Sequence, residues 1–464
     1  MDDNAVMSKD SVLELFGLED QDVDSAHYKN INGNALLDIK LIPHYEPCPD
    51  CGALEPWIKD YRIKRIRHSV LADRKCTLIY HARRYQCREC NHVYLEKNPF
   101  VFKKMRISAK TVMNVLEDLK DYNETFSSVA KRYDISPTTA ASIFDSHVCI
   151  PRKTLPEMIS IDECYAFKHH SDKYVCVLLD FKTNKPIDIL NSRRKEVLDN
   201  YFRSIDPQER KKVKAVSFDM YDAYRSAAYQ FFENCIGIVD RFHLCQEYGR
   251  KADSIRIRIM KGHEKGSDSY YLLKSFSWMI YKHNDSSAQS GKTPIFDPNH
   301  QRKYNMHFHR YMNYYEIREM MLDIHPDLRK AWDFKEEIYD FYKTASLENA
   351  SDILDGLIRK MKASGIDELI QFSKTLRKWK QEIINSLTVF EYFYDVKKET
   401  GHVDVYEKRM HNGNIENRNA IIKCVKANAN GYKNWDRFRN RLLYVLDPDV
   451  NYNLNPLPEY IRKK

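Results

Sequence analysis

The most constraining feature of this chain is the order of strand and helix patterns between residues 158 and 240. Apolar runs bounded by polar or turn-forming residues predict strands, and apolar positions at helical spacing predict helices. Strands are predicted over residues 158–162, 174–180, 186–190, 213–219 and 235–239, and helices over residues 194–205 and about 223–232. The order is therefore β-β-β-α-β-α-β, with three strands before the first helix and alternation after it.

Two of the predicted strands end in an aspartate. Asp162 follows the run 158–161, and Asp219 follows residues 213–218. The order of elements is that of a ribonuclease-H-like core, a mixed sheet in which these two strands are neighbours. We therefore expect the two carboxylates to lie close together. The alternative for each is an aspartate that caps the turn after its strand.

A third carboxylate, Glu416, begins a helical pattern after the polar turn at residues 411–414. Asn419 and Lys423 fall near the same helix face, so an amide and a cation would point the same way as Glu416. Two aspartates from strands and a glutamate from a helix can hold a pair of Mg²⁺ ions, for which Mn²⁺ can substitute. Two such metals bind the attacking and leaving oxygens of a phosphodiester. The alternative for Glu416 is a surface helix of mixed charge.

Asp240 and His243 come directly after the last predicted strand. Three positions apart at a helix start, they share a face and could position a scissile phosphate or adjust the charge of the site. The alternative is an aspartate that caps the helix, together with a packed histidine. Residues from about 241 to 396 have mainly helical patterns. If Glu416 belongs to the site, this stretch is an insertion into the catalytic fold.

Two Cys-x-x-Cys pairs, Cys48 with Cys51 and Cys87 with Cys90, predict one structural zinc ion. This spacing lets two thiolates share a tetrahedral zinc, and Gly52 can supply the tight turn after the first pair. The residues between the pairs predict a strand over 77–85, as in a zinc ribbon, and the long gap implies an inserted β-hairpin. The alternatives are two unrelated cysteine pairs, or a site that uses one of the nearby side chains Cys76, His81 and His92.

Residues from about 105 to 150 predict three short helices, and residues 124–144 among them fit a helix-turn-helix. In this interpretation Ser136 is the N-cap of the second helix, with Pro137 at its first position. The side chains offered to DNA are Ser136, Thr138, Thr139 and Ser142 for the major groove, and Lys103, Lys104 and Arg106 for phosphates. The alternatives are a plain helical hairpin and a solvated basic surface.

The composition favours a nucleic-acid partner and no membrane. A formal net charge of +9 suits a polyanion. No apolar stretch approaches the roughly 20 residues of a membrane span. Eleven cysteines, with four of them in pairs, indicate metal binding in a reducing compartment rather than disulfides. The acidic residues 1–4 lack a signal-peptide pattern, so we expect a cytoplasmic protein.

Together these motifs resemble the ISL-three family of bacterial insertion-sequence transposases, over about residues 45–445. The resemblance rests on the ribbon, the helix-turn-helix, Ile161-Asp162-Glu163, Ser217-Phe218-Asp219-Met220, Asp240-Arg241-Phe242-His243 and the stretch 412–441. It implies a DDE (Asp-Asp-Glu) catalytic domain whose triad is Asp162, Asp219 and Glu416. It also implies that Lys423 is the basic residue seven positions after the glutamate, and that Asp240 and His243 form an Asp-x-x-His element. His411 departs from the family pattern, in which a small or basic residue precedes Asn-Gly.

The sequence therefore predicts a multidomain α/β enzyme that binds the terminal inverted repeats of an insertion sequence and catalyses Mg²⁺-dependent DNA nicking and strand transfer. Its partners would be double-stranded DNA and, when two ends are synapsed, a second copy in a homodimer. The alternative is a non-catalytic zinc-ribbon/helix-turn-helix regulator derived from a transposase. The predicted parts are a segment of unassigned role (1–45), the zinc ribbon (46–98), the helix-turn-helix domain (99–155), the catalytic domain (156–250 and 398–445), the helical insertion (251–397) and a C-terminal tail (446–464).

Overall fold

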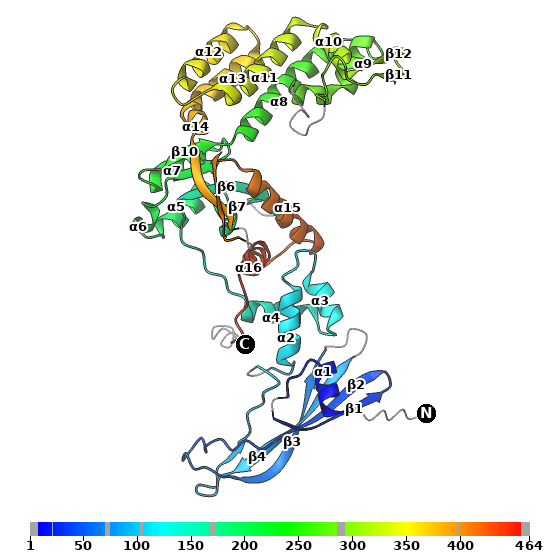
Figure 1. Ribbon diagram of the computed structural model, residues 1–464, viewed down its shortest axis with the longest axis vertical. Helices are drawn as coiled ribbons and strands as arrows, with labels where there is room; N and C mark the ends of the chain where they lie inside the picture. Colours follow the sequence, from blue (N-terminus) through cyan, green and yellow to red (C-terminus); the bar gives the residue numbers. More distant parts are fainter. Residues whose placement is uncertain are drawn as a thin grey trace. The chain divides into compact units, whose positions relative to one another are not determined.

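The computed structural model describes residues 8–20, 22–69, 75–102, 105–167, 172–284, 293–396 and 400–455. The chain divides into two compact units, one made of residues 1–151 with 420–464 and the other of residues 152–419 (Figure 1). Each unit buries a hydrophobic cluster of its own. The predicted domain limits follow motifs rather than contacts, so they stay predictions.

The first unit contains a five-stranded sheet that starts within the N-terminal segment. Its strands are β1 (Val23–Ile31), β2 (Asn34–Leu41), β3 (Trp57–Arg67), β4 (Cys76–Gln86) and β5 (Val93–Leu95). They lie in the order β1-β2-β4-β3, and β5 also pairs with β4. Only β2 and β4 run parallel among these pairs. Residues 1–45 therefore supply two strands to the sheet that also holds the strand predicted between the cysteine pairs.

One face of this sheet forms the core of the first unit. Every second residue of β2 and β4, such as Leu37 and Leu78, is buried together with Val12 and Leu13 of helix α1 (Lys9–Leu15). This period-two burial is what a half-covered sheet requires. The hairpin predicted between the cysteine pairs is confirmed, because β3 and β4 pair antiparallel along their length.

His68 lies at the edge of this core and is held in its neutral form. The side chain is fully buried, with Nδ1 2.8 Å from the Ser108 hydroxyl and Nε2 2.8 Å from the Phe16 carbonyl oxygen. The carbonyl can only accept, so Nε2 donates and Nδ1 accepts from Ser108. Burial lowers the pKa of His68 below its ordinary value, against the opposing effect of the Phe16 carbonyl.

We expect the first unit to lose stability as the pH falls below about 6.5, the ordinary histidine pKa. In that range the unfolded chain takes up a proton on His68 and the folded chain does not, so acid favours unfolding by up to about 1.4 kcal/mol per pH unit. Urea denaturation from pH 8 to pH 5 measures this slope. The His68→Gln variant should be less stable at pH 8 and show a shallower slope. An unchanged slope in the variant would contradict the assignment.

Three short helices follow the sheet, as the sequence predicts: α2 (Ala109–Asp118), α3 (Phe126–Arg132) and α4 (Pro137–His147). Thr125 and Ser128 form a capping box at α3. The Ser136 side chain caps α4 by accepting the Thr139 N–H, which confirms the predicted cap.

The C-terminal helix α16 (Trp435–Leu446) packs on these three helices. Arg441 has no exposed surface, and its guanidinium donates to the carbonyl oxygens of Asp121 and Glu124, at 2.8 Å each. Tyr444 donates to the carbonyl oxygen of Leu116 at 3.0 Å. A buried guanidinium is tolerated only when such partners replace water. The contacts therefore make α16 part of the first unit.

The second unit is built on a mixed five-stranded sheet with the order β10-β9-β6-β7-β8. The strands are β6 (Met158–Tyr165), β7 (Tyr174–Asp180), β8 (Pro186–Leu190), β9 (Ala215–Phe218) and β10 (Ile236–Val239), and the helices between them are α5 (Lys195–Arg203), α6 (Pro207–Arg210) and α7 (Asp222–Phe231). β7 is antiparallel to β6 and β8, whereas β6, β9 and β10 run parallel. The predicted element order is confirmed, with α6 as an addition.

The stretch between β10 and residue 388 is mainly helical, as predicted. Its helices are α8 (Arg241–Met260), α9 (Asp268–Ser275), the 3-10 turn η1 (Ser277–Tyr281), α10 (Tyr314–Leu322), α11 (Pro326–Thr344), α12 (Ala350–Ala363), α13 (Asp367–Lys378) and α14 (Lys380–Asn385). Tyr248 of α8 is buried and donates to the Ala331 carbonyl oxygen of α11 at 2.6 Å. No helix in the described ranges is long and apolar enough to cross a membrane.

Two hairpins were not predicted. They are β11 (Lys303–Asn305) with β12 (Arg310–Met312), and β13 (Val389–Val396) with β14 (Val403–Arg409). The three-residue strands carry too little sequence pattern to be recognised. β13 is different, because its residues are mostly β-branched or aromatic, and this composition was a usable signal. After β14 the chain enters α15 (Gly413–Asn428).

Candidate functional site

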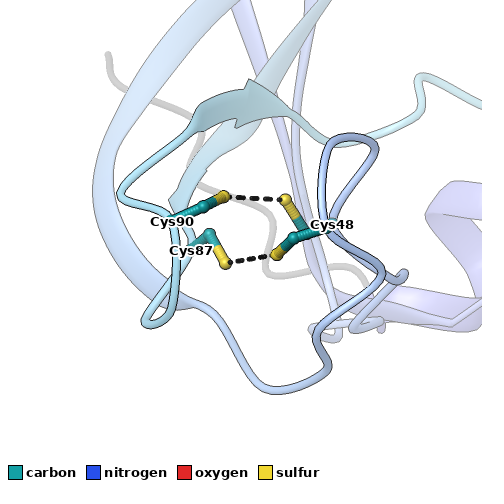
Figure 2. Close-up of side chains that lie close together, drawn as sticks. Cys48, Cys87 and Cys90 are labelled. Carbon is teal, nitrogen blue, oxygen red and sulfur yellow. Dashed lines mark hydrogen bonds between the residues drawn. The ribbon is translucent and has the colours of Figure 1, made fainter.

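The four paired cysteines meet at one point of the first unit. The Sγ atoms of Cys48 and Cys90 are 3.6 Å apart, those of Cys51 and Cys87 are 3.5 Å apart, and all four lie within 4.8 Å of one another. Figure 2 shows the labelled side chains Cys48, Cys87 and Cys90 directed toward each other. Tetrahedral zinc at Zn–S bonds of 2.3 Å implies sulfur separations of about 3.8 Å, close to those found here. The cluster therefore fits zinc.

Local backbone structure explains how each pair turns its sulfurs inward. Gly52 follows Cys51 with a φ of +74°, a conformation that glycine adopts without strain, and its N–H donates to the Cys48 carbonyl oxygen at 2.9 Å. At the second pair the backbone N–H of Cys90 is the main cause that lowers the pKa of Cys87 to about 7. A thiol that ionises this readily suits a metal ligand.

The other candidate zinc ligands lie outside the cluster. Cys76 is buried in the sheet core, where burial raises the pKa of its thiol to about 12. His81 contacts Asp38 at 2.8 Å, and His92 contacts Asp50 at 2.9 Å. Each of the three has its own structural environment, so the four paired cysteines form the site.

In the second unit, the parallel pairing of β6 and β9 brings the two aspartates level. Ser160 pairs with Ser217, and two residues further along each chain come Asp162 and Asp219. One expectation is wrong in detail: Asp162 is not at the end of its strand. β6 continues to Tyr165 because residues 162–165 keep pairing with β7 after β9 has ended. Asp162 thus lies where β6 no longer pairs with β9 and pairs with β7 alone.

The electrostatics of these two carboxylates are unusual. Burial, followed by repulsion from Glu163, raises the pKa of Asp162 to about 6. The same two causes, with repulsion from Asp162 added, raise the pKa of Asp219 to about 8. The Oδ1 atom of Asp219 is buried and has no hydrogen-bond partner among the described residues. Buried carboxylates that repel one another would be stabilised by a bound cation.

Helix α15 carries three more of the predicted residues of the site. Glu416 lies in its first turn, is exposed, and contributes to the raised pKa of Asp162, which places it within electrostatic reach. Asn419 is buried and donates from Nδ2 to Oδ2 of Asp162 at 2.8 Å. Lys423 is exposed two turns after Glu416 on the same helix. Asn419 therefore orients Asp162 directly.

The start of α15 is anchored to the core by Asn412, to which the sequence assigned no role of its own. Asn412 has no exposed surface; its side-chain oxygen accepts from the Ser217 hydroxyl at 2.7 Å, and its N–H donates to Asp240 at 3.2 Å. His411, the departure from the family pattern, accepts the Gly413 N–H at 3.1 Å. Asp240 occupies the N-cap position of α8 without a side-chain cap bond, so its carboxylate serves Asn412 instead.

His243 lies one turn into α8 and acts on the site electrostatically. It opposes the upward shift of the Asp162 pKa, and its Nε2 is buried without a partner among the described residues. A hollow of about 290 Å³ opens between α8 and the start of α15. Its walls are formed by Asp240, Arg241, Phe242, Cys245, Tyr339, His411, Gly413 and Glu416.

Glu163 and Arg193 belong to the site, although the sequence assigned a role to neither. The Glu163 carboxylate accepts from Arg193 at 2.6 Å and from the Tyr224 hydroxyl at 3.4 Å. It raises the pKa of both aspartates. Its position next to Asp162 was the only signal available, since strand alternation would direct it to the opposite face.

The predicted DNA-contacting residues differ in their exposure. Thr138 is exposed, whereas Thr139 and Ser142 are half-buried. The Ser136 hydroxyl is engaged with Thr138 and Thr139 at the start of α4, at 2.9 Å and 2.7 Å. Arg106 is exposed. Lys103 and Lys104 lie outside the described residues.

Two profiles of known protein families match the chain, one over most of the second unit and one over the cysteine cluster. A profile of an ISL-three DDE transposase family, described as transposase, matches residues 159–392 and 396–442, more than half of the chain. A profile described as the zinc finger of the transposases of IS204, IS1001, IS1096 and IS1165 matches residues 44–90.

One curated relative is the transposase for insertion sequence element IS1001 from Bordetella parapertussis, which is 22% identical over 245 residues. The aligned region is 52% of this chain and 59% of that relative. The predicted family and the cysteine cluster are thereby confirmed. The chain belongs to the ISL-three family of DDE transposases.

Proposed function

We propose that this protein is a transposase that nicks DNA at the ends of its insertion sequence and joins the freed ends to target DNA. The observation that supports the proposal is that Asp162 and Asp219 follow paired serines on two neighbouring parallel strands, and that Glu416 of α15 is close enough to raise the pKa of Asp162. We further propose that the sheet with order β10-β9-β6-β7-β8 is a ribonuclease-H-like core. The name of the Bordetella relative supports the same activity.

The residues of the site fit two Mg²⁺ ions held by Asp162, Asp219 and Glu416. The fit rests on the raised pKa values of the two aspartates and on the unpartnered Oδ1 atom of Asp219, an oxygen ligand available to a hard cation. When bound, the metals would polarise the scissile phosphate and activate the attacking oxygen. Mn²⁺ would serve in the same place.

The chain's own residues supply orientation. Asn419 holds Oδ2 of Asp162, so the other oxygen, which accepts from the Glu163 N–H, keeps a fixed direction. Asp240 and Asn412 fix where α15 begins and therefore where Glu416 stands. The hollow beside Glu416 leaves room for a DNA strand, and His243 and Lys423 would favour its phosphates. The helices α8 to α14 would shield the site or hold a second DNA end.

In this proposal water attacks a phosphorus atom at the element's end, and the bond to the 3′ oxygen breaks. The freed 3′-hydroxyl then attacks a phosphorus atom of target DNA, forming one phosphodiester bond while another breaks. No covalent bond to the protein is needed, because positioning and charge stabilisation supply the catalysis.

The first unit would recognise the DNA. We propose that the four cysteines hold one structural Zn²⁺ and that α3 and α4 act as a helix-turn-helix on the terminal inverted repeats. Because two ends must be brought together for joining, a homodimer is proposed on DNA. In the cell, the protein would be located with the DNA that carries these repeats.

The test is incubation of purified protein with labelled duplex DNA that carries the element's ends, with Mg²⁺ or with EDTA. Mg²⁺-dependent 3′-end nicks and joined products are expected. Binding without cleavage would instead support the alternative, a non-catalytic DNA-binding regulator. Nicks without joined products would indicate a nuclease rather than a transposase.

A further inference from the structure

Most side chains of strand β3 in the first unit are exposed. It forms one edge of the sheet and pairs, among the described strands, with β4 alone. Only its last residue, Arg67, makes further backbone bonds, to residues 106 and 108. Residues 57–66 therefore present an unpaired edge, which natural sheets normally keep short or cover.

This strand carries five basic side chains and one acidic side chain among its 11 residues. The acidic residue, Asp60, is neutralised by an ion pair with Arg84 of β4. None of Lys59, Lys64 and Arg65 forms an ion pair with a residue that the structure describes. The positive charge of β3 is therefore not compensated within the unit, and it favours a polyanion.

The face of the sheet that carries part of this charge is also open. On the opposite face, Ile66 of β3 and its neighbours on β2 and β4 are buried with α1, whereas Tyr61 and Ile63 on β3 are 51% and 61% exposed. Arg65 lies on the same open face, since it is two positions from Ile63. The acidic residue on this face, Asp38, already contacts His81. Cations interleaved with an aromatic and an aliphatic side chain are typical of a nucleic-acid surface.

The dimensions of the strand suit a DNA duplex. Eleven residues of extended chain span roughly 35 Å, about one turn of B-DNA. β4 is paired on its other side with β2 and β5, so β3 would meet DNA as the edge of a five-stranded sheet rather than as a two-stranded ribbon. Basic side chains along this edge would reach phosphates.

We propose that β3 is a duplex-DNA docking surface. Tyr61, Ile63 and Arg65 on the open face would meet the DNA. Lys59 and Lys64 would reach phosphates along the edge of the strand, Lys64 from the opposite face, where it is half-buried. The proposal rests on the proposed function, because it assigns a part of DNA binding to the sheet next to the zinc cluster rather than to α4 alone. A second copy of the chain is a poor occupant, because two edges of this charge would repel each other.

The test measures binding to a labelled duplex of arbitrary sequence by fluorescence anisotropy over a range of salt concentrations. The variant Lys59→Gln/Lys64→Gln/Arg65→Gln is compared with the charge-preserving variant Lys59→Arg/Lys64→Arg/Arg65→Lys. A matched control, Lys330→Gln/Lys362→Gln/Lys374→Gln, removes three exposed charges from helices α11 to α13. Zinc content and near-ultraviolet circular dichroism establish that each variant is folded.

Removal of the three β3 charges should weaken binding by on the order of tenfold to a hundredfold. It should also lower the number of ions released on binding, which the salt dependence of the affinity measures, by about three. The charge-preserving variant should bind like the wild type, and the matched control should lose much less affinity. Equal losses in the β3 variant and the matched control would overturn the proposal, because net charge alone would then explain them.

Three other results are also decisive. If the β3 variant binds the duplex as tightly as the wild type, the docking surface is overturned and the proposed function is unaffected. A wild-type protein that binds no duplex at all would overturn both. A change in oligomeric state on light scattering, without a change in salt dependence, would assign β3 to a contact between copies instead.

Discussion

Replacement of Asp162 or Asp219 by asparagine is expected to lower Mg²⁺-dependent nicking by about a thousandfold or more. The reason is that a metal-held site supplies several kcal/mol of charge stabilisation, and each 1.4 kcal/mol is a factor of ten in rate. Binding to repeat-end DNA should survive, since neither residue lies in the first unit. The measurement is single-turnover nicking of labelled DNA beside an anisotropy titration of the same variants.

The Asp219→Asn variant also separates catalysis from folding. Burial and repulsion already oppose the charged form of Asp219, so a neutral amide removes an electrostatic cost. The melting temperature without Mg²⁺ should be unchanged or higher, while activity is lost. The matched control is Asp222→Asn, an exposed aspartate paired with Lys378, which should keep full activity. A large fall in melting temperature for Asp219→Asn would assign the residue a structural role.

Loss of zinc is expected to unfold the ribbon part of the first unit. Structural zinc provides on the order of 10 kcal/mol in small metal-dependent folds, because the unfolded chain has no preformed site. The Cys51→Ser variant should bind far less than one zinc ion per chain and lose affinity for DNA. Its second unit, which has a separate core, should keep its own unfolding transition.

The control for this experiment is Cys149→Ser, an exposed cysteine outside the cluster. It should retain one zinc ion by elemental analysis and the wild-type melting profile. Retention of zinc and of the full profile by Cys51→Ser would contradict the four-cysteine site. The design separates the metal's effect from general thiol chemistry, because both substitutions remove one exposed thiol.

Local sequence patterns predicted much of the structure. The five strands of the main sheet of the second unit were predicted to within a few residues, because each is an apolar run closed by polar residues. The cap of α4 and the cysteine knuckles are also local, since side chain and backbone partners lie within a few positions. The error at Asp162 has the opposite origin: a strand continues where a neighbour still pairs with it, and pairing is not a local property.

Contacts between distant residues were decided only by the tertiary structure. Asn419 reaches Asp162 across 257 positions, Asn412 reaches Asp240 across 172, and Arg441 reaches Asp121 across 320. No periodicity encodes such pairs, because each depends on how complete elements pack. The same holds for the open face of β3, whose basic residues resemble any solvated strand until the sheet shows which side α1 covers. The sequence by itself determined the family, the elements and the metal-binding residue types. The packing decided which residues orient the metal-binding side chains, because burial and long-range hydrogen bonds exist only in the assembled fold.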